Sequence, residues 1–130
     1  MKKGINPKHA PKPTGPYSQA IMTESLLFCS GQIAKDPETG KLLAGSIQDQ
    51  TKLIMRNFEA ILSEAGCGFD DVLKATVYLK DMASFKEVNE VYSHCFNEPY
   101  PARSKIQVAA LPLGADVEIE LIAKVGSKGK

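Results

Sequence analysis

The sequence has few of the residues that build metal centres and disulfide frameworks. It contains three cysteines and two histidines among 130 residues. Cys29, Cys67 and Cys95 lie far apart, without a Cys-x-x-Cys pair. An odd, dispersed set of cysteines is typical of thiols in a reducing compartment. His94 stands beside Cys95, but adjacent residues on a helix point in different directions, so we expect no metal site.

A charge excess and a long apolar run are also missing. The 16 lysines and arginines nearly balance 15 aspartates and glutamates, for a net charge of +1, which gives no electrostatic signature of nucleic-acid or anionic-membrane binding. No apolar run approaches the roughly 20 residues that span a bilayer. The N-terminal lysines are not followed by the apolar segment of a secretory signal. We therefore expect a cytoplasmic protein, with mitochondria as the alternative, and neither a membrane nor a nucleic-acid partner.

Length and composition predict one domain over residues 1–130. The chain is 43% hydrophobic and 24% charged, which is ordinary for soluble domains, and a chain of this length can bury roughly two-thirds of its unfolded surface. Residues 1–13 are basic and carry three prolines, so we expect an irregular lead-in. Residues 126–130 are expected to form a polar tail.

Alternating apolar and polar residues predict about five strands. Along the predicted strand 72–80, the side expected to be buried carries Leu73, Ala75, Val77 and Leu79. The last two strands flank a turn rich in proline and glycine, and we expect them to meet across it. The predicted ranges are 17–22, 26–29, 72–80, 103–108 and 117–125.

Two helices are expected between these strands. Ser46 is a good N-cap with Asp49 three residues on, and Gly66 can close the helix that follows. Asp81 can cap a second helix that ends before Pro99. The order of elements predicts an α+β fold, in which a sheet of about five strands carries both helices on one face.

The opposite face of the predicted sheet mixes charged, polar and apolar residues. Such a face can be solvated, as in many antiparallel sheets. It can also be buried against copies of itself, with its charges lining clefts between subunits. Periodicity leaves both arrangements open. The polar residues that we assign to this face are Lys74, Thr76, Tyr78, Arg103, Lys105, Glu118 and Glu120.

Arg103 and Glu118 are the strongest candidates for chemistry. A Walker-type phosphate loop, a dinucleotide fingerprint, a serine nucleophile elbow and a cysteine-protease pattern are all missing. A guanidinium presents paired planar donors that match a carboxylate, so Arg103 could anchor a small organic acid. Glu118 could accept a proton or orient water. From residue types alone, a cross-strand or intersubunit salt bridge between the two is the favoured interpretation.

Motifs spread along the chain resemble a known family. Pro101-Ala102-Arg103-Ser104 and Val117-Glu118-Ile119, in their order and spacing, are similar to the C-terminal signature of the Rid (YjgF-type) reactive intermediate deaminases. The resemblance covers residues 15–123. The further motifs that carry it are Gly15-Pro16-Tyr17-Ser18-Gln19-Ala20, Ser30-Gly31-Gln32, Ala65-Gly66-Cys67 and Val88-Asn89-Tyr92.

The resemblance implies a chorismate-mutase-like homotrimer, with inward-facing sheets and clefts between subunits. Similar members hydrolyse 2-imino acids and their enamine tautomers, such as 2-iminobutanoate and 2-iminopropanoate, to 2-keto acids and ammonia. Pyridoxal-phosphate enzymes such as threonine or serine dehydratase release these substrates, and no metal or organic cofactor is needed. Arg103 would hold the substrate carboxylate and Glu118 would position the hydrolytic water. The other expected cleft residues are Tyr17, Ser30, Gly31, Phe85 and Asn89, of which Phe85 has ordinary helix packing as an equal alternative.

Lys105 departs from the family pattern, because many members have cysteine at this position. Alternation places Lys105 on the same strand face as Arg103, two residues along. A second cation there could strengthen carboxylate binding, or it could extend into solvent.

A function of another class remains open. The same cleft could belong to a non-catalytic module that binds a metabolite or regulates a partner, since some relatives have been associated with translation inhibition, RNA cleavage or chaperone-like behaviour. The weak net charge and the missing aromatic-basic strip argue against a dedicated RNA binder. The two classes differ in whether the protein accelerates the appearance of keto acid.

Overall fold

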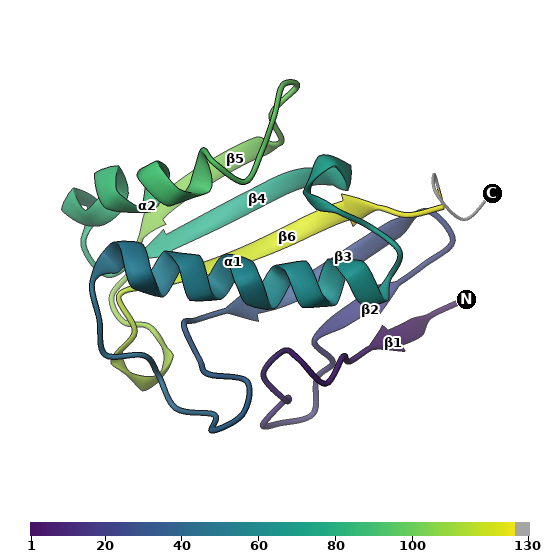
Figure 1. The fold of residues 1–130 in the computed structure, drawn as a ribbon, viewed down its shortest axis with the longest axis horizontal. Coiled ribbons are helices and arrows are strands. Elements are labelled where there is room, and N and C mark those ends of the chain that lie inside the picture. Colours follow the sequence, from purple (N-terminus) through teal and green to yellow (C-terminus); the bar gives the residue numbers. More distant parts are fainter. Residues whose placement is uncertain (127–130) are drawn as a thin grey trace.

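The computed structural model describes residues 1–126, which form a six-stranded sheet with two α-helices on one face (Figure 1). This arrangement confirms the predicted α+β class and adds one strand. Of the predicted polar tail, residues 127–130 lie outside the described residues. The helices are α1 (Ile47–Glu64) and α2 (Phe85–Tyr92), with 3-10 turns η1 (Phe69–Asp71), η2 (Met82–Ser84) and η3 (Pro112–Gly114). The strands are β1 (Lys3–Ile5), β2 (Ala20–Met22), β3 (Leu26–Gln32), β4 (Val72–Leu79), β5 (Ala102–Gln107) and β6 (Val117–Lys124).

The strand order is β1-β2-β3-β6-β4-β5, which puts β6 in the centre and β5 at an edge (Figure 1). β4 and β5 are parallel and are joined through α2, while the other neighbouring strands are antiparallel. A parallel pair needs a crossover connection, and α2 provides it. The prediction that the last two strands meet across their turn is therefore wrong, since β4 lies between them.

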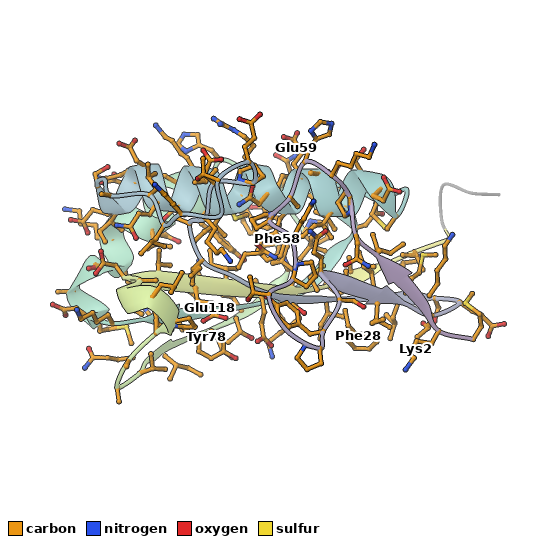
Figure 2. All side chains as sticks on the ribbon, turned by 90° about the horizontal axis from the view of Figure 1, so that it is seen from below. Lys2, Phe28, Phe58, Glu59, Tyr78 and Glu118 are labelled. Atoms are coloured by element: carbon orange, nitrogen blue, oxygen red, sulfur yellow. The ribbon has the colours of Figure 1, made fainter. Side chains whose placement is uncertain are left out.

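Helix α1 begins and ends where the sequence predicts. The Ser46 hydroxyl accepts a hydrogen bond from the Asp49 amide at 3.0 Å, and Gly66 adopts a φ of +78°, which suits glycine at a helix C-terminus. Phe58 is fully buried between α1 and the sheet, whereas Glu59 on the same helix points away from it (Figure 2). Within residues 1–126, no helix has the length and apolar character needed to cross a bilayer.

The N-terminal lead-in is more ordered than its prolines indicate. β1 pairs with β2, and the side chains of Ile5 and Ala10 belong to the hydrophobic core. The buried Gln19 amide nitrogen donates to the backbone carbonyls of Ala10 and Pro11. A proline retains its carbonyl, so a segment without regular structure can still be fixed by a buried donor. The prediction of an irregular lead-in is wrong for β1.

A β-bulge changes the predicted face of one residue in β4. Val72 pairs with Ala123 and Lys74 pairs with Ile122, so Leu73 is the extra residue between two successive pairs. Leu73 is consequently 46% exposed, whereas Val72 is buried. Alternation fails at this position because a bulge sets two residues opposite one.

Candidate functional site

Four of the predicted site residues line one cavity beside the sheet. Tyr17 precedes β2, Ser30 and Gly31 belong to β3, and Glu118 belongs to β6. The cavity has a volume of about 720 Å³. The other residues that line it include Pro11, Lys12, Thr14, Gln19, Lys35, Pro112 and Leu113.

A bulge in β3 shapes the floor of this cavity. The pairing of β3 with β6 shifts between Cys29 and Gln32, so the strand is irregular at Ser30 and Gly31. The Ser30 hydroxyl donates to the Ser18 carbonyl at 2.7 Å, and its amide donates to the Gln19 carbonyl at 2.9 Å. These two hydrogen bonds fix the turn of backbone that carries Gly31.

Gly31 lies against the Glu118 carboxylate with no room for a side chain. A Cβ atom added at Gly31 would overlap Glu118 Oε2 and would lie 2.9 Å from Cδ and 3.2 Å from Cγ. The overlapping atoms form the end of a flexible side chain, so Glu118 would move while the strand would not.

We therefore expect Gly31→Ala to displace the Glu118 carboxylate from the cavity floor. The reaction proposed below should slow by roughly 10²-fold, since a small misplacement of a catalytic group has effects of that order. Steady-state kinetics measure the loss of rate, and a thermal unfolding curve measures whether the strand keeps its stability. A variant with normal kcat would show that the position of Glu118 is unimportant, and a large loss of stability would show that the strand, rather than the side chain, had moved.

Glu118 lies on the sheet face that the helices leave uncovered, as Tyr78 and Phe28 do (Figure 2). Partial burial raises the pKa of Glu118 above its ordinary value, and the neighbouring Glu120 raises the pKa further. Tyr78 donates its hydroxyl to Glu120 Oε1 at 3.1 Å. A carboxyl with a raised pKa is suited to exchanging protons with a bound substrate.

The other predicted site residues gather along α2 and β5. Arg103 Nη1 donates to Asn89 Oδ1 at 2.8 Å. The Arg103 Cζ atom lies 4.8 Å from the ring centroids of both Phe85 and Tyr92, and Lys105 Nζ lies 3.9 Å from the Phe85 centroid. Both cations are within the range of cation–π attraction. Phe85 also packs against the hydrophobic core, so it serves helix packing and contacts the cations.

These two groups of residues lie on opposite faces of the sheet. Arg103 pairs with Ala75, which is fully buried on the helix side of β4. Glu118 pairs with Tyr78, which points to the uncovered face (Figure 2). The prediction that Arg103 and Lys105 share the mixed face with Glu118 is therefore wrong. A cross-strand salt bridge between Arg103 and Glu118 within one chain is excluded by the same register.

The error has a physical cause in the position of β5. All six of its residues are exposed, because the strand lies at the sheet edge beyond the core and beside α2. Polar residues are tolerated on both faces of such a strand, so polarity no longer marks the uncovered face.

Several residues that shape the site were missed by reasoning from residue types. Gln19 and Tyr92 lie inside motifs of the family resemblance, and that placement is the signal that could have identified them. Lys12 and Lys35 carry no such signal. A separate cavity of about 680 Å³ between α1 and α2 contains none of the predicted site residues, so we do not include it in the site. Within residues 1–126, no three side chains of the types that bind metals gather as a group.

Comparisons with known proteins give the family. The sequence model of the Endoribonuclease L-PSP family matches residues 7–125. A RutC family protein of Pyrococcus horikoshii is 50% identical over 123 residues, covering 95% of this chain and 98% of the relative. The human protein named 2-iminobutanoate/2-iminopropanoate deaminase is 42% identical over 126 residues, covering 97% of this chain and 92% of the relative.

A solved structure agrees with these relatives. The crystal structure of E. coli TdcF with bound serine is 42% identical and superposes with a TM-score of 0.89, covering 95% of this chain and 99% of that chain. Family motifs, sequence identity and fold thus coincide over nearly the whole length of the chain. The chain belongs to the Endoribonuclease L-PSP family, which is the Rid/YjgF family that its motifs resemble.

Proposed function

We propose that the protein hydrolyses 2-imino acids and their enamine tautomers to 2-keto acids and ammonia. The observation that carries this proposal is the position of the Arg103 guanidinium. Asn89 holds it from one side while the side chain remains exposed, so its other donors are available to a carboxylate. The name of the human relative, 2-iminobutanoate/2-iminopropanoate deaminase, supports the same substrate class.

We infer that the complete site needs a second copy of the chain. Arg103 and Glu118 lie on opposite sheet faces, so a small substrate held by one is separated from the other within a single chain. The uncovered face also exposes apolar side chains, with Phe28 and Ile106 each 44% exposed. A sheet face of this kind favours burial against another subunit. A homotrimer, as the family resemblance implies, would join the Arg103 group of one copy to the Glu118 cavity of the next.

The proposed chemistry is addition of water followed by loss of ammonia. Water adds its oxygen to C2 of the imine, the C=N bond becomes single, and Glu118 passes the proton of the water to nitrogen. The carbinolamine then forms its C=O bond and breaks the C–N bond, and Glu118 passes the hydroxyl proton to the departing ammonia. Arg103 binds the carboxylate throughout. One imino acid and one water thus give one 2-keto acid and one ammonia, with no cofactor.

The substrates must come from a reaction that releases an imine or enamine into solution. Elimination of water from serine or threonine by a pyridoxal-phosphate dehydratase is such a reaction, so we propose a functional link to enzymes of this class. The relative crystallised with bound serine supports a family site sized for small amino-acid-like molecules.

The direct test is the rate of keto-acid release during a dehydratase reaction. With threonine as the starting amino acid, we expect the purified protein to accelerate the formation of 2-oxobutanoate from the released imine, and heat-denatured protein to have no effect. An unchanged rate together with measurable binding of 2-oxobutanoate would instead support a non-catalytic metabolite-binding module. Incubation with RNA tests for the endoribonuclease activity after which the family is named.

A further inference from the structure

Lys105 gives the site a second cation beside the carboxylate anchor. Its Nζ atom lies 3.9 Å from the Phe85 centroid, and Arg103 Cζ lies 4.8 Å from the same ring. Residues two apart on a strand share one face and are separated by about 6.6 Å. The edge formed by α2 and β5 therefore presents two positive groups to the cleft, one after the other along the strand.

The surroundings of the two cations favour two anion positions rather than one. Both cations contact Phe85, but Arg103 also contacts Asn89 and Tyr92, which lie one to two helical turns further along α2, whereas Lys105 contacts Phe85. An arginine fork binds a carboxylate through paired donors and needs no second cation for that carboxylate. A lysine is a compact charge on a flexible stem, which suits it to a separate carboxylate whose position varies between substrates.

The cavity beside Glu118 adds further positive charge. Lys12 and Lys35 line it, and Glu118 is the one acidic residue among its described lining. When the two halves join as proposed above, the cleft contains four cations from Lys12, Lys35, Arg103 and Lys105, against Glu118 and its neighbour Glu120. A monocarboxylic imino acid supplies a single carboxylate to this surplus of positive charge, whereas a dicarboxylic one supplies two.

We propose that, besides monocarboxylic substrates, the cleft takes dicarboxylic 2-imino acids, with Arg103 binding the carboxylate next to the imine and Lys105 binding the side-chain carboxylate. This inference rests on the proposed imine hydrolysis and names its substrate class. Dehydration of serine or threonine does not yield such imines. They arise when an oxidase or dehydrogenase transfers a hydride from C2 of an acidic amino acid to a flavin or nicotinamide, which is reduced, while the amino nitrogen releases a proton and the C=N bond forms.

The test compares two imines in the wild-type protein, Lys105→Met and Lys86→Met. An aspartate oxidase supplies 2-iminosuccinate, and threonine dehydratase supplies 2-iminobutanoate. Because losing one partner of a charge pair is costly, Lys105→Met should lower the ratio of kcat/KM for 2-iminosuccinate to that for 2-iminobutanoate by about tenfold or more. Lys86 is an exposed residue of α2, and its variant removes the same charge and should keep the wild-type ratio. An equal ratio in the wild type and Lys105→Met would overturn the proposal.

A binding measurement separates this inference from the proposed function. Calorimetry with 2-oxoglutarate and 2-oxobutanoate reports on the second carboxylate without any turnover. We expect the wild type to bind 2-oxoglutarate more tightly and Lys105→Met to lose most of that preference. If the protein hydrolyses neither imine, the proposed function fails, while a Lys105-dependent preference for 2-oxoglutarate still supports the second carboxylate position. Equal affinity for both acids overturns the inference even where 2-iminobutanoate is hydrolysed.

Discussion

Arg103→Met is expected to lower kcat/KM for 2-iminobutanoate by roughly 10²- to 10³-fold, because removing one partner of a hydrogen-bonded charge pair costs about 2–5 kcal/mol and 1.4 kcal/mol is tenfold. The Arg103 guanidinium lies over the rings of Phe85 and Tyr92, and methionine is an unbranched side chain that can pack against aromatic rings without a charge. The loss then reports on the guanidinium itself. Initial rates with enzymatically generated imine provide the measurement.

Two further variants test whether the effect is specific to the Arg103 guanidinium. Arg103→Lys keeps the charge without the planar fork, so it should recover only part of the activity. Arg56→Met removes an exposed arginine from α1, away from the site, and should behave as the wild type does. Size-exclusion mass and thermal unfolding verify that all variants keep the fold and the assembly. Full activity in a correctly assembled Arg103→Met would remove the basis of the proposed function.

Glu118→Gln is expected to lower kcat by roughly 10²- to 10⁴-fold, the range over which general acid–base groups contribute. Glutamine retains the shape of the side chain and cannot accept the proton of the attacking water. In the wild type, kcat/KM should increase as the pH rises through the raised pKa of Glu118, because the ionised form is the base. The same profile should be flat in Glu118→Gln, and a preserved pH dependence would assign the titration to another group.

The same substitution should not destabilise the protein at neutral pH. Burial and Glu120 raise the pKa of Glu118 in the folded state, so the folded protein favours the protonated carboxyl. The stability that this form contributes is complete below the unfolded-state pKa and is lost as the pH rises through the folded-state pKa. Glutamine does not ionise, so Glu118→Gln should match the wild type at acidic pH and exceed its stability at neutral pH. Urea unfolding under both conditions measures the difference, and a variant less stable at neutral pH would contradict this account.

The sequence predicts the parts of the fold that local chemistry determines. Helix α1 follows from its Ser46 cap, its apolar face and the closing Gly66, all of which act within a few residues. Residues 117–125 are predicted as a strand and β6 spans Val117–Lys124, since this central strand packs one face beneath the helices and alternation is preserved along its length. The order and spacing of the motifs also identify the family, because that inference rests on several motifs together and does not depend on any single residue.

The remaining features depend on contacts that are distant in sequence. The order of the strands places β4 between β5 and β6. The turn residues at 111–114 do not indicate which strands become neighbours. The buried amide of Gln19 fixes the lead-in from a position outside it. The separation of Arg103 from Glu118 follows from the same strand order, so alternation assigns the two candidates to one face although they lie on opposite faces.

The exposure of β5 has a consequence for how this protein could acquire new substrates. Its side chains contribute nothing to the hydrophobic core, while its backbone is held in register by β4. Arg103 and Lys105, on the helix side of this strand, can therefore be exchanged without creating cavities or overpacking in the core. The residues proposed to recognise the acid groups thus stand on a strand whose side chains lie outside the core, which lets selectivity diverge by single substitutions while the fold is inherited unchanged.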